Sequence, residues 1–321
     1  MLATLLAGCN GCHHPTTDTS CPTGTCDSPV YGRRANATLY GSLPDEGYGA
    51  ALAWRAGAIW VGAPFDPGGG RLYKEEALIR TGVPFLGTAL VADDDTVLVG
   101  GDGRVEDDAG TVLATGTGIG GVLAASGTRW VTRGPTGAVW DNGSVNSYSA
   151  RPDSIAILPE ADGTMTLGVG FAFGTVALVA DGLTISRDTL DEAGWAVLPF
   201  DADGDGIADW IVGAPGGNRV DIRDGTSLAL RASWSPGTGR FGASLATDGT
   251  FVYVGAPMAG TDAQGAVWRC DPRVDPTTAC TLLESGHNLQ DQLGFSLAWG
   301  GENLYIGAPG GPGTAGSVVV R

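Results

Sequence analysis

Short apolar runs recur along the chain, and several of them end in the same three residues. The tripeptide Gly-Ala-Pro follows such a run at residues 62–64, 213–215, 255–257 and 307–309. Continuous apolar runs of this length, rather than alternating ones, are typical of strands buried on both faces. Proline ends a strand because it has no N–H for the ladder, and the small residues before it let backbones approach closely. The pattern predicts one strand-containing unit repeated along the chain.

Weaker copies of the same unit lie between the intact ones, at residues 97–102, 130–135 and 167–170. If residues 64, 102, 135, 170, 215, 257 and 309 are equivalent, the spacings are 38, 33, 35, 45, 42 and 52. A period near 40 residues of all-strand character is the signature of a β-propeller blade. The sequence therefore predicts an all-β, seven-bladed propeller over residues 36–321. A generic β-sandwich does not explain a fixed tripeptide at this interval.

The two ends of the repeat region complement each other. The last copy stops at residues 316–321, one strand short, and the first begins one strand early, at residues 37–41. We expect the N-terminal strand to complete the seventh blade, because this removes an open sheet edge that would favour aggregation.

Composition limits the possible partners. The chain has 54 glycines in 321 residues, without a collagen period, and a formal net charge of −17. Strong negative charge argues against nucleic acid, whose phosphates need a basic surface. No stretch approaches the ~20 apolar residues of a membrane-spanning helix. We expect a monomer that meets a membrane only through a possible lipid anchor.

An acidic loop precedes one of the apolar runs. Asp201, Asp203 and Asp205 stand at alternate positions and Gly206 follows them. Their oxygens are expected to face one turn, with glycine permitting the sharp bend. Calcium takes six to eight oxygen ligands in irregular geometry, whereas magnesium needs a tight octahedron. The loop therefore predicts a Ca²⁺ site.

The loop is not an EF-hand. An EF-hand needs a bidentate glutamate at its twelfth position, which here is Val212, within an apolar run. We expect Asp209 to close the site, with the carbonyl of Ile207 as main-chain ligand. An acidic surface turn without a metal is the alternative.

An aromatic–glycine pair or its relative stands before three of the four intact copies, at residues 48–49, 241–242 and 293–295. With the Gly-Ala-Pro tripeptides, these units resemble the FG-GAP repeats of the integrin α-subunit propeller, over residues 36–321. That family carries DxDxDGxxD calcium loops between the first two strands of a blade, and residues 201–209 match the pattern in full. The resemblance implies one calcium site, because the loops at 93–95 and 160–163 are incomplete.

The N-terminus carries a possible export signal. Residues 6–9, Leu-Ala-Gly-Cys, resemble the bacterial lipobox, in which the chain is cut before the cysteine and its thiol, here Cys9, is lipidated. A basic region upstream is missing, so an accidental match is the alternative. We interpret residues 1–9 as a signal remnant and 10–35 as a disordered Cys/Thr/Pro-rich tether. The expected location is secreted or in the cell envelope, anchored to a bacterial outer membrane.

Cysteine spacing suggests two disulfides. Cys270 and Cys280 bracket what looks like a long hairpin, and Cys21 and Cys26 could close a small loop. Lipidation of Cys9 would leave Cys12 unpaired. Paired cysteines favour an oxidising compartment.

No catalytic set is visible. His287 is the only histidine outside the tether, and no Ser/His/Asp or Cys/His set can be placed on common turns. Nine tryptophans raise a lectin hypothesis, which is weakened because Trp54 matches Trp299, and Trp140 matches Trp268, by position in the repeat. We therefore expect a calcium-binding, non-catalytic module for adhesion or for binding a protein or glycan on a loop face. The alternatives are a carbohydrate-binding propeller and, third, a hydrolase.

Overall fold

The computed structural model describes residues 36–321, apart from 149, 160–163, 174–175, 181–182 and 187–190. These residues belong to the second of two units into which the chain divides, Met1–Val30 and Tyr31–Arg321. The predicted signal, tether, lipidation at Cys9 and pairing of Cys21 with Cys26 all lie outside the described residues. Among the residues described, no helix is long and apolar enough to cross a membrane.

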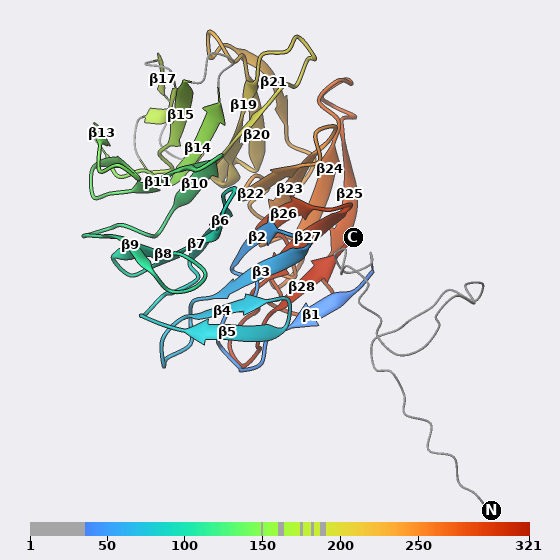
Figure 1. Ribbon diagram of the computed structural model, residues 1–321. Helices are drawn as coiled ribbons and strands as arrows, with labels where there is room; N and C mark the ends of the chain where they lie inside the picture. Colours follow the sequence, from blue (N-terminus) through green and yellow to red (C-terminus); the bar gives the residue numbers. More distant parts are fainter. Residues whose placement is uncertain (1–35, 149, 160–163, 174–175, 181–182, 187–190) are drawn as a thin grey trace, which may run out of the picture. The chain divides into compact units, whose positions relative to one another are not determined.

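Seven four-stranded antiparallel sheets make up the fold, which is a seven-bladed β-propeller, as predicted (Figure 1). Each of the first six blades is built from four strands consecutive in the chain. In chain order the strands of blades 1 to 3 are β2 (Ala51–Arg55), β3 (Ala58–Ala63), β4 (Arg71–Lys74), β5 (Ala77–Thr81); β6 (Ala89–Ala92), β7 (Val97–Gly101), β8 (Arg104–Glu106), β9 (Val112–Thr115); β10 (Leu123–Ser126), β11 (Arg129–Arg133), β12 (Gly137–Trp140), β13 (Val145–Ser147). Those of blades 4 to 6 are β14 (Ser154–Pro159), β15 (Met165–Gly170), β16 (Val176–Ala180), β17 (Leu183–Ser186); β18 (Ala196–Phe200), β19 (Asp209–Ala214), β20 (Arg219–Arg223), β21 (Leu230–Trp234); β22 (Ser244–Thr247), β23 (Val252–Ala256), β24 (Ala266–Cys270), β25 (Cys280–Ser285).

The seventh blade joins the two ends of the repeat region. It contains β26 (Ser296–Gly300), β27 (Asn303–Ala308), β28 (Ser317–Val320) and, at its outer edge, β1 (Thr38–Tyr40). Strand β1 pairs antiparallel with β28, with Leu39 opposite Val318. The first strands of successive blades contact one another around the ring, and β26 of the last blade contacts β2 of the first. The predicted closure by an N-terminal strand is therefore confirmed.

The repeated glycines are explained by contacts between blades. In six of the seven interfaces, the glycine of the Gly-Ala-Pro position packs so closely that an added Cβ would overlap the carbonyl oxygen of the glycine that opens the next blade. The glycine that opens the next blade also donates its N–H to a residue of that same blade. In blade 6, the N–H of Gly242 donates to the carbonyl oxygen of Gly255 at 3.1 Å. Its φ is positive, +99° at Gly242, a conformation that favours glycine. The six pairs are Gly62 with Gly87, Gly100 with Gly120, Gly170 with Gly194, Gly213 with Gly242, Gly255 with Gly294, and Gly307 with Gly49.

The interface between blades 3 and 4 departs from this rule. By strand register, Thr132 occupies the position of Gly62, because it pairs with the first residue of β10 as Gly62 pairs with the first residue of β2. Register also corrects two expected equivalences. The counterpart of Pro64 is Gly134 in blade 3 rather than residue 135, and Ala172 in blade 4 rather than residue 170. The sequence alone placed these weaker copies incorrectly because Thr132 and Phe171 stand where the other blades have the small residues of the repeat.

Aromatic pairs fill equivalent places between blades. Trp54 stacks on Tyr305 of the preceding blade at 5.2 Å between ring centroids, and Trp299 stacks on Tyr253 at 5.6 Å. Both pairs join the first strand of one blade to the second strand of the blade before it. The prediction that Trp54 and Trp299 are equivalent packing residues is confirmed.

Candidate metal centre and its surroundings

The aspartate loop lies between β18 and β19, the first two strands of blade 5, as the resemblance implied. Gly204 and Gly206 have φ values of +82° and +88°, and a Cβ at either position would meet nothing within 4 Å. These glycines are therefore required by backbone conformation and not by lack of space.

Three of the predicted ligands come together in this loop. One carboxylate oxygen from each of Asp201, Asp203 and Asp205 lies within 4.8 Å of the others. Backbone N–H groups orient all three carboxylates. Asp201 accepts from Gly204 at 2.7 Å and Gly206 at 3.1 Å. Asp203 accepts from the N–H of Asp205 at 3.1 Å, and Asp205 accepts from Ile207 at 2.8 Å.

Asp209 lies outside this group of three. Its side chain is buried at the start of β19, and its two oxygens accept from the N–H of Gly225 at 3.0 Å and that of Ala202 at 3.3 Å. Burial raises the pKa of Asp209 above its usual value, and the nearby Arg231 only partly offsets this. In this structure Asp209 fastens the base of the loop to the turn after β20.

Arg231 is the residue that sequence reasoning missed. It extends from β21 and forms ion pairs with Asp203, with Asp209 at 3.1 Å and with Asp224 at 3.0 Å. Its position depends on strand pairing within blade 5, so no local motif marks it. Arg231 supplies positive charge beside the cluster of three carboxylates.

The chemistry of the donor set fits a hard cation. Asp201, Asp203 and Asp205 offer only oxygen, without nitrogen or sulfur ligands, which suits calcium or magnesium rather than zinc. Asp203 and Asp205 are exposed to solvent, so an ion can reach them. No second group of three possible ligands occurs in the part of the chain that the structure describes.

The incomplete loop of blade 2 is held by its own backbone. The Oδ1 of Asp93 accepts from the N–H groups of Asp95, at 2.8 Å, and Thr96, at 2.6 Å. This is a local turn closed by an aspartate side chain. The loop at residues 160–163 lies outside the described residues.

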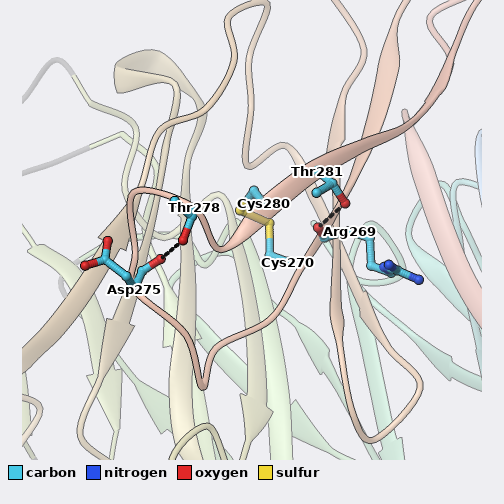
Figure 2. Close-up of a disulfide and its surroundings, with 6 residues drawn as sticks. All are labelled: Arg269, Cys270, Asp275, Thr278, Cys280 and Thr281. Carbon is cyan, nitrogen blue, oxygen red and sulfur yellow. Dashed lines mark hydrogen bonds between the residues drawn. A yellow bond between two sulfur atoms is a disulfide. The ribbon is translucent and has the colours of Figure 1, made fainter.

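The predicted disulfide between Cys270 and Cys280 is present and joins facing residues of β24 and β25 (Figure 2). The Cα atoms are 4.0 Å apart and the bond closes a loop of sequence separation 10. Within the loop, the backbone carbonyl oxygen of Asp275 accepts two hydrogen bonds from Thr278. One comes from the backbone N–H at 3.0 Å and the other from the side-chain hydroxyl at 3.3 Å. Cys270 belongs to the same buried cluster as Phe200 and Ala202, which begin the aspartate loop. The hairpin of blade 6 thus packs against the base of the candidate metal centre.

Two tryptophans predicted as packing residues also line clefts. Trp268 lies in a cleft of about 420 Å³ with Gly237, Gln264 and Ser285 among its lining residues. Its equivalent, Trp140, lies in a cleft of about 360 Å³ beside Arg129. His287 is 85% exposed and 3.9 Å from Glu284, as an ordinary loop residue would be.

Comparisons with known proteins support the fold. No protein family matches the chain, and no curated protein matches it. Among solved structures, it is similar to the extracellular domain of a putative one-component system from B. thetaiotaomicron, with a TM-score of 0.57 and 13% identity. The match covers 89% of this chain and 40% of that one, so this chain spans less than half of its neighbour's length. This likeness supports a propeller and leaves the FG-GAP relationship as a resemblance.

Proposed function

We propose that the chain is a calcium-binding propeller, secreted or on the cell surface, that acts as a non-catalytic binding or adhesion module. The observation that carries the proposal is the convergence of Asp201, Asp203 and Asp205 within 4.8 Å on one turn. Bound calcium would supply positive charge that holds the three carboxylates together. The similar domain from B. thetaiotaomicron is described as extracellular, which supports an extracellular setting, as does the Cys270–Cys280 disulfide.

The loop is well placed to stabilise the ring. Phe200 and Ala202, which begin the loop, belong to the same buried cluster as Cys270 and Ala279 of blade 6. An ion that fixes the loop would therefore also stiffen the junction between blades 5 and 6. The module would bind its partner with a preformed surface, and preformed surfaces lose less entropy on binding.

Thermal unfolding of the full chain with calcium and with chelator tests the proposal. Calcium at 100-fold over its dissociation constant adds about 2.7 kcal/mol to the free energy of unfolding, which for a domain of this size raises the midpoint by roughly 5 °C. Asp205→Asn should abolish the rise, since it removes the charge but keeps an acceptor for Ile207.

Asp275→Asn is the matched control. Asp275 also accepts a backbone N–H two residues on, from Thr277 at 2.8 Å, but it lies outside the cluster. This variant should keep the full calcium response. If calcium does not raise the unfolding midpoint of the unmodified chain, the loop is only an acidic turn and calcium-dependent adhesion loses its main support.

A carbohydrate-binding propeller is the second candidate, favoured by the clefts at Trp140 and Trp268. Neutral sugars stack on aromatic rings, so a sugar ligand should change tryptophan fluorescence in a saturable way. Soluble sugars that compete with the partner would favour this candidate over a protein ligand.

A further inference from the structure

The junction of blades 3 and 4 breaks the packing rule that the other six interfaces follow. Thr132 replaces the glycine that the other six blades have at this position, and the next residue, Arg133, occupies the position of Ala63. In the other six blades this position holds a buried uncharged residue, namely Ala63, Gly101, Phe171, Ala214, Ala256 and Ala308. A local departure from an otherwise consistent packing pattern points to a functional site.

Arg133 is half-buried and forms no ion pair with a described residue. Its Nε is buried without a hydrogen-bond partner, and the structure shows no ion pair or side-chain hydrogen bond for Arg133 among the described residues. A buried guanidinium nitrogen without an acceptor is unfavourable, because a buried polar group normally has a hydrogen-bond partner.

The guanidinium of Arg133 lies in a space kept open by Gly121. A Cβ at Gly121 would overlap Nη2 of Arg133 and lie 2.9 Å from its Nε. Gly121 does not have a positive φ. Glycine at this position is therefore explained by the room that Arg133 needs and not by the backbone conformation.

A second arginine adds positive charge at the same place. Arg151, in the link from blade 3 to blade 4, is exposed and likewise has no ion pair with any described residue. Burial, and then the charge of Arg151, lower the pKa of Arg133 below its ordinary value, and Asp153 only partly offsets them. Asp153 is itself engaged, since its Oδ2 accepts the N–H of Ala172 at 2.8 Å. Two arginines that form no ion pair with a described residue are unexpected in a chain of net charge −17.

We propose that Arg133, which packs against Gly121, and Arg151 form a binding site for an oxyanion, that is a carboxylate, sulfate or phosphate group of the module's ligand. The planar fork of an arginine matches two oxygens of such a group. The inference deepens the proposed function and rests on it for the role of the site, but it does not require the calcium loop. At physiological ionic strength the Debye length is about 8 Å, so acidic residues farther away are largely screened, and Asp153 is the carboxylate that acts on Arg133.

The experiment measures the unfolding midpoint of the full chain while sulfate, phosphate or acetate replaces chloride at constant ionic strength. At least one anion should raise the midpoint in a saturable way, and the three arms distinguish tetrahedral anions from carboxylates. Arg133→Ala restores the residue found at this position in four other blades. It should abolish the anion response while leaving the midpoint in chloride unchanged or higher.

Arg240→Ala is the matched control. Arg240 also lies in a link between blades, but it is ion-paired with Glu192 at 2.6 Å, so this variant should keep the full anion-dependent rise. Arg151→Gln should weaken the response severalfold. The proposal is overturned if no anion acts differently from chloride, or if Arg133→Ala keeps the response. It is also overturned if Arg133→Ala lowers the midpoint in chloride by several degrees, which would make Arg133 a packing residue. A calcium effect without an anion effect would refute this inference alone.

Discussion

The contact between glycines of adjacent blades makes a quantitative prediction for Gly255→Ala. The added Cβ would lie 2.0 Å from the carbonyl oxygen of Gly294 and 2.2 Å from Oγ of Ser244. Real Cβ atoms stay at least 3.0 Å from such atoms, so blades 6 and 7 must separate by about 1 Å. The obstacle is backbone, which cannot rotate away as a side chain does.

The expected loss of stability has two parts. Overpacking a well-packed interior costs about 1–3 kcal/mol. The separation also weakens the hydrogen bond that Ser244 donates to the carbonyl of Gly294 at 2.7 Å, worth about 1 kcal/mol. The sum, about 2–4 kcal/mol, corresponds to a fall of roughly 3–7 °C in the unfolding midpoint of a domain of this size.

Differential scanning calorimetry of Gly255→Ala beside Gly68→Ala gives the test. Neither glycine has a positive φ, and a Cβ at Gly68 would meet only Asp66, at an ordinary 3.4 Å. Gly68→Ala should therefore change the free energy of unfolding by no more than about 0.5 kcal/mol. Equal effects of the two substitutions would refute the close approach of blades as the reason for the repeat.

Three further predictions concern the candidate metal centre, the disulfide and an inter-blade tyrosine. Arg231→Gln removes a positive charge that contacts Asp203 and should tighten calcium binding about fivefold, since about 1 kcal/mol of repulsion is lost; calorimetric titration showing an unchanged or weaker dissociation constant would contradict it. Replacing Cys270 and Cys280 by serine should lower the free energy of unfolding by about 2–3 kcal/mol, from the entropy of a loop of separation 10; denaturant unfolding that matches the unmodified chain would rule this out. Burial, and then the hydrogen bond to Asp248, raise the pKa of Tyr253 above its ordinary 10.0, so the stability gained from its protonated form is present below pH 10 and is lost as the pH rises further. Between pH 9 and pH 11, the free energy of unfolding of Tyr253→Phe should fall less than that of the unmodified chain. Identical decreases would show that Tyr253 does not cause this pH dependence.

The sequence predicted the fold because the fold imposes a local rule. Six of the seven interfaces pair a glycine of positive φ with a glycine of the preceding blade, and both recur in the sequence at regular intervals. Where Thr132 replaces the second glycine, the pattern weakened and the expected alignment moved by one residue. The acidic loop was predicted for a similar reason, since Asp201, Asp203 and Asp205 are brought together by a single turn.

What the sequence did not predict depends on contacts between distant residues. Arg231 reaches Asp203 and Asp209 only because β21 returns along blade 5, and no spacing rule connects them. The sequence predicted Asp209 as a metal ligand. Its burial and the hydrogen bond that it accepts from the N–H of Gly225 follow from the pairing of β19 with β20, which no local pattern indicates. The unpaired charge of Arg133 becomes visible only when the other six blades show what its position normally holds.

The closure of the ring by β1 also determines how the molecule bears a mechanical load. The N–H of Asn36 donates to Val320 at 2.7 Å, and that of Val320 donates to Ala37 at 2.9 Å, so any pull on the chain before Asn36 first reaches these bonds. A pull across the strand would break them one after another, whereas a pull along it would load them together and meet more resistance. Once β1 has separated, the N–H of Gly41, which donates to the carbonyl oxygen of Gly316 at 3.2 Å, is the next attachment. Tension on the N-terminal side would therefore open the ring at blade 7 while the other six blades remain intact.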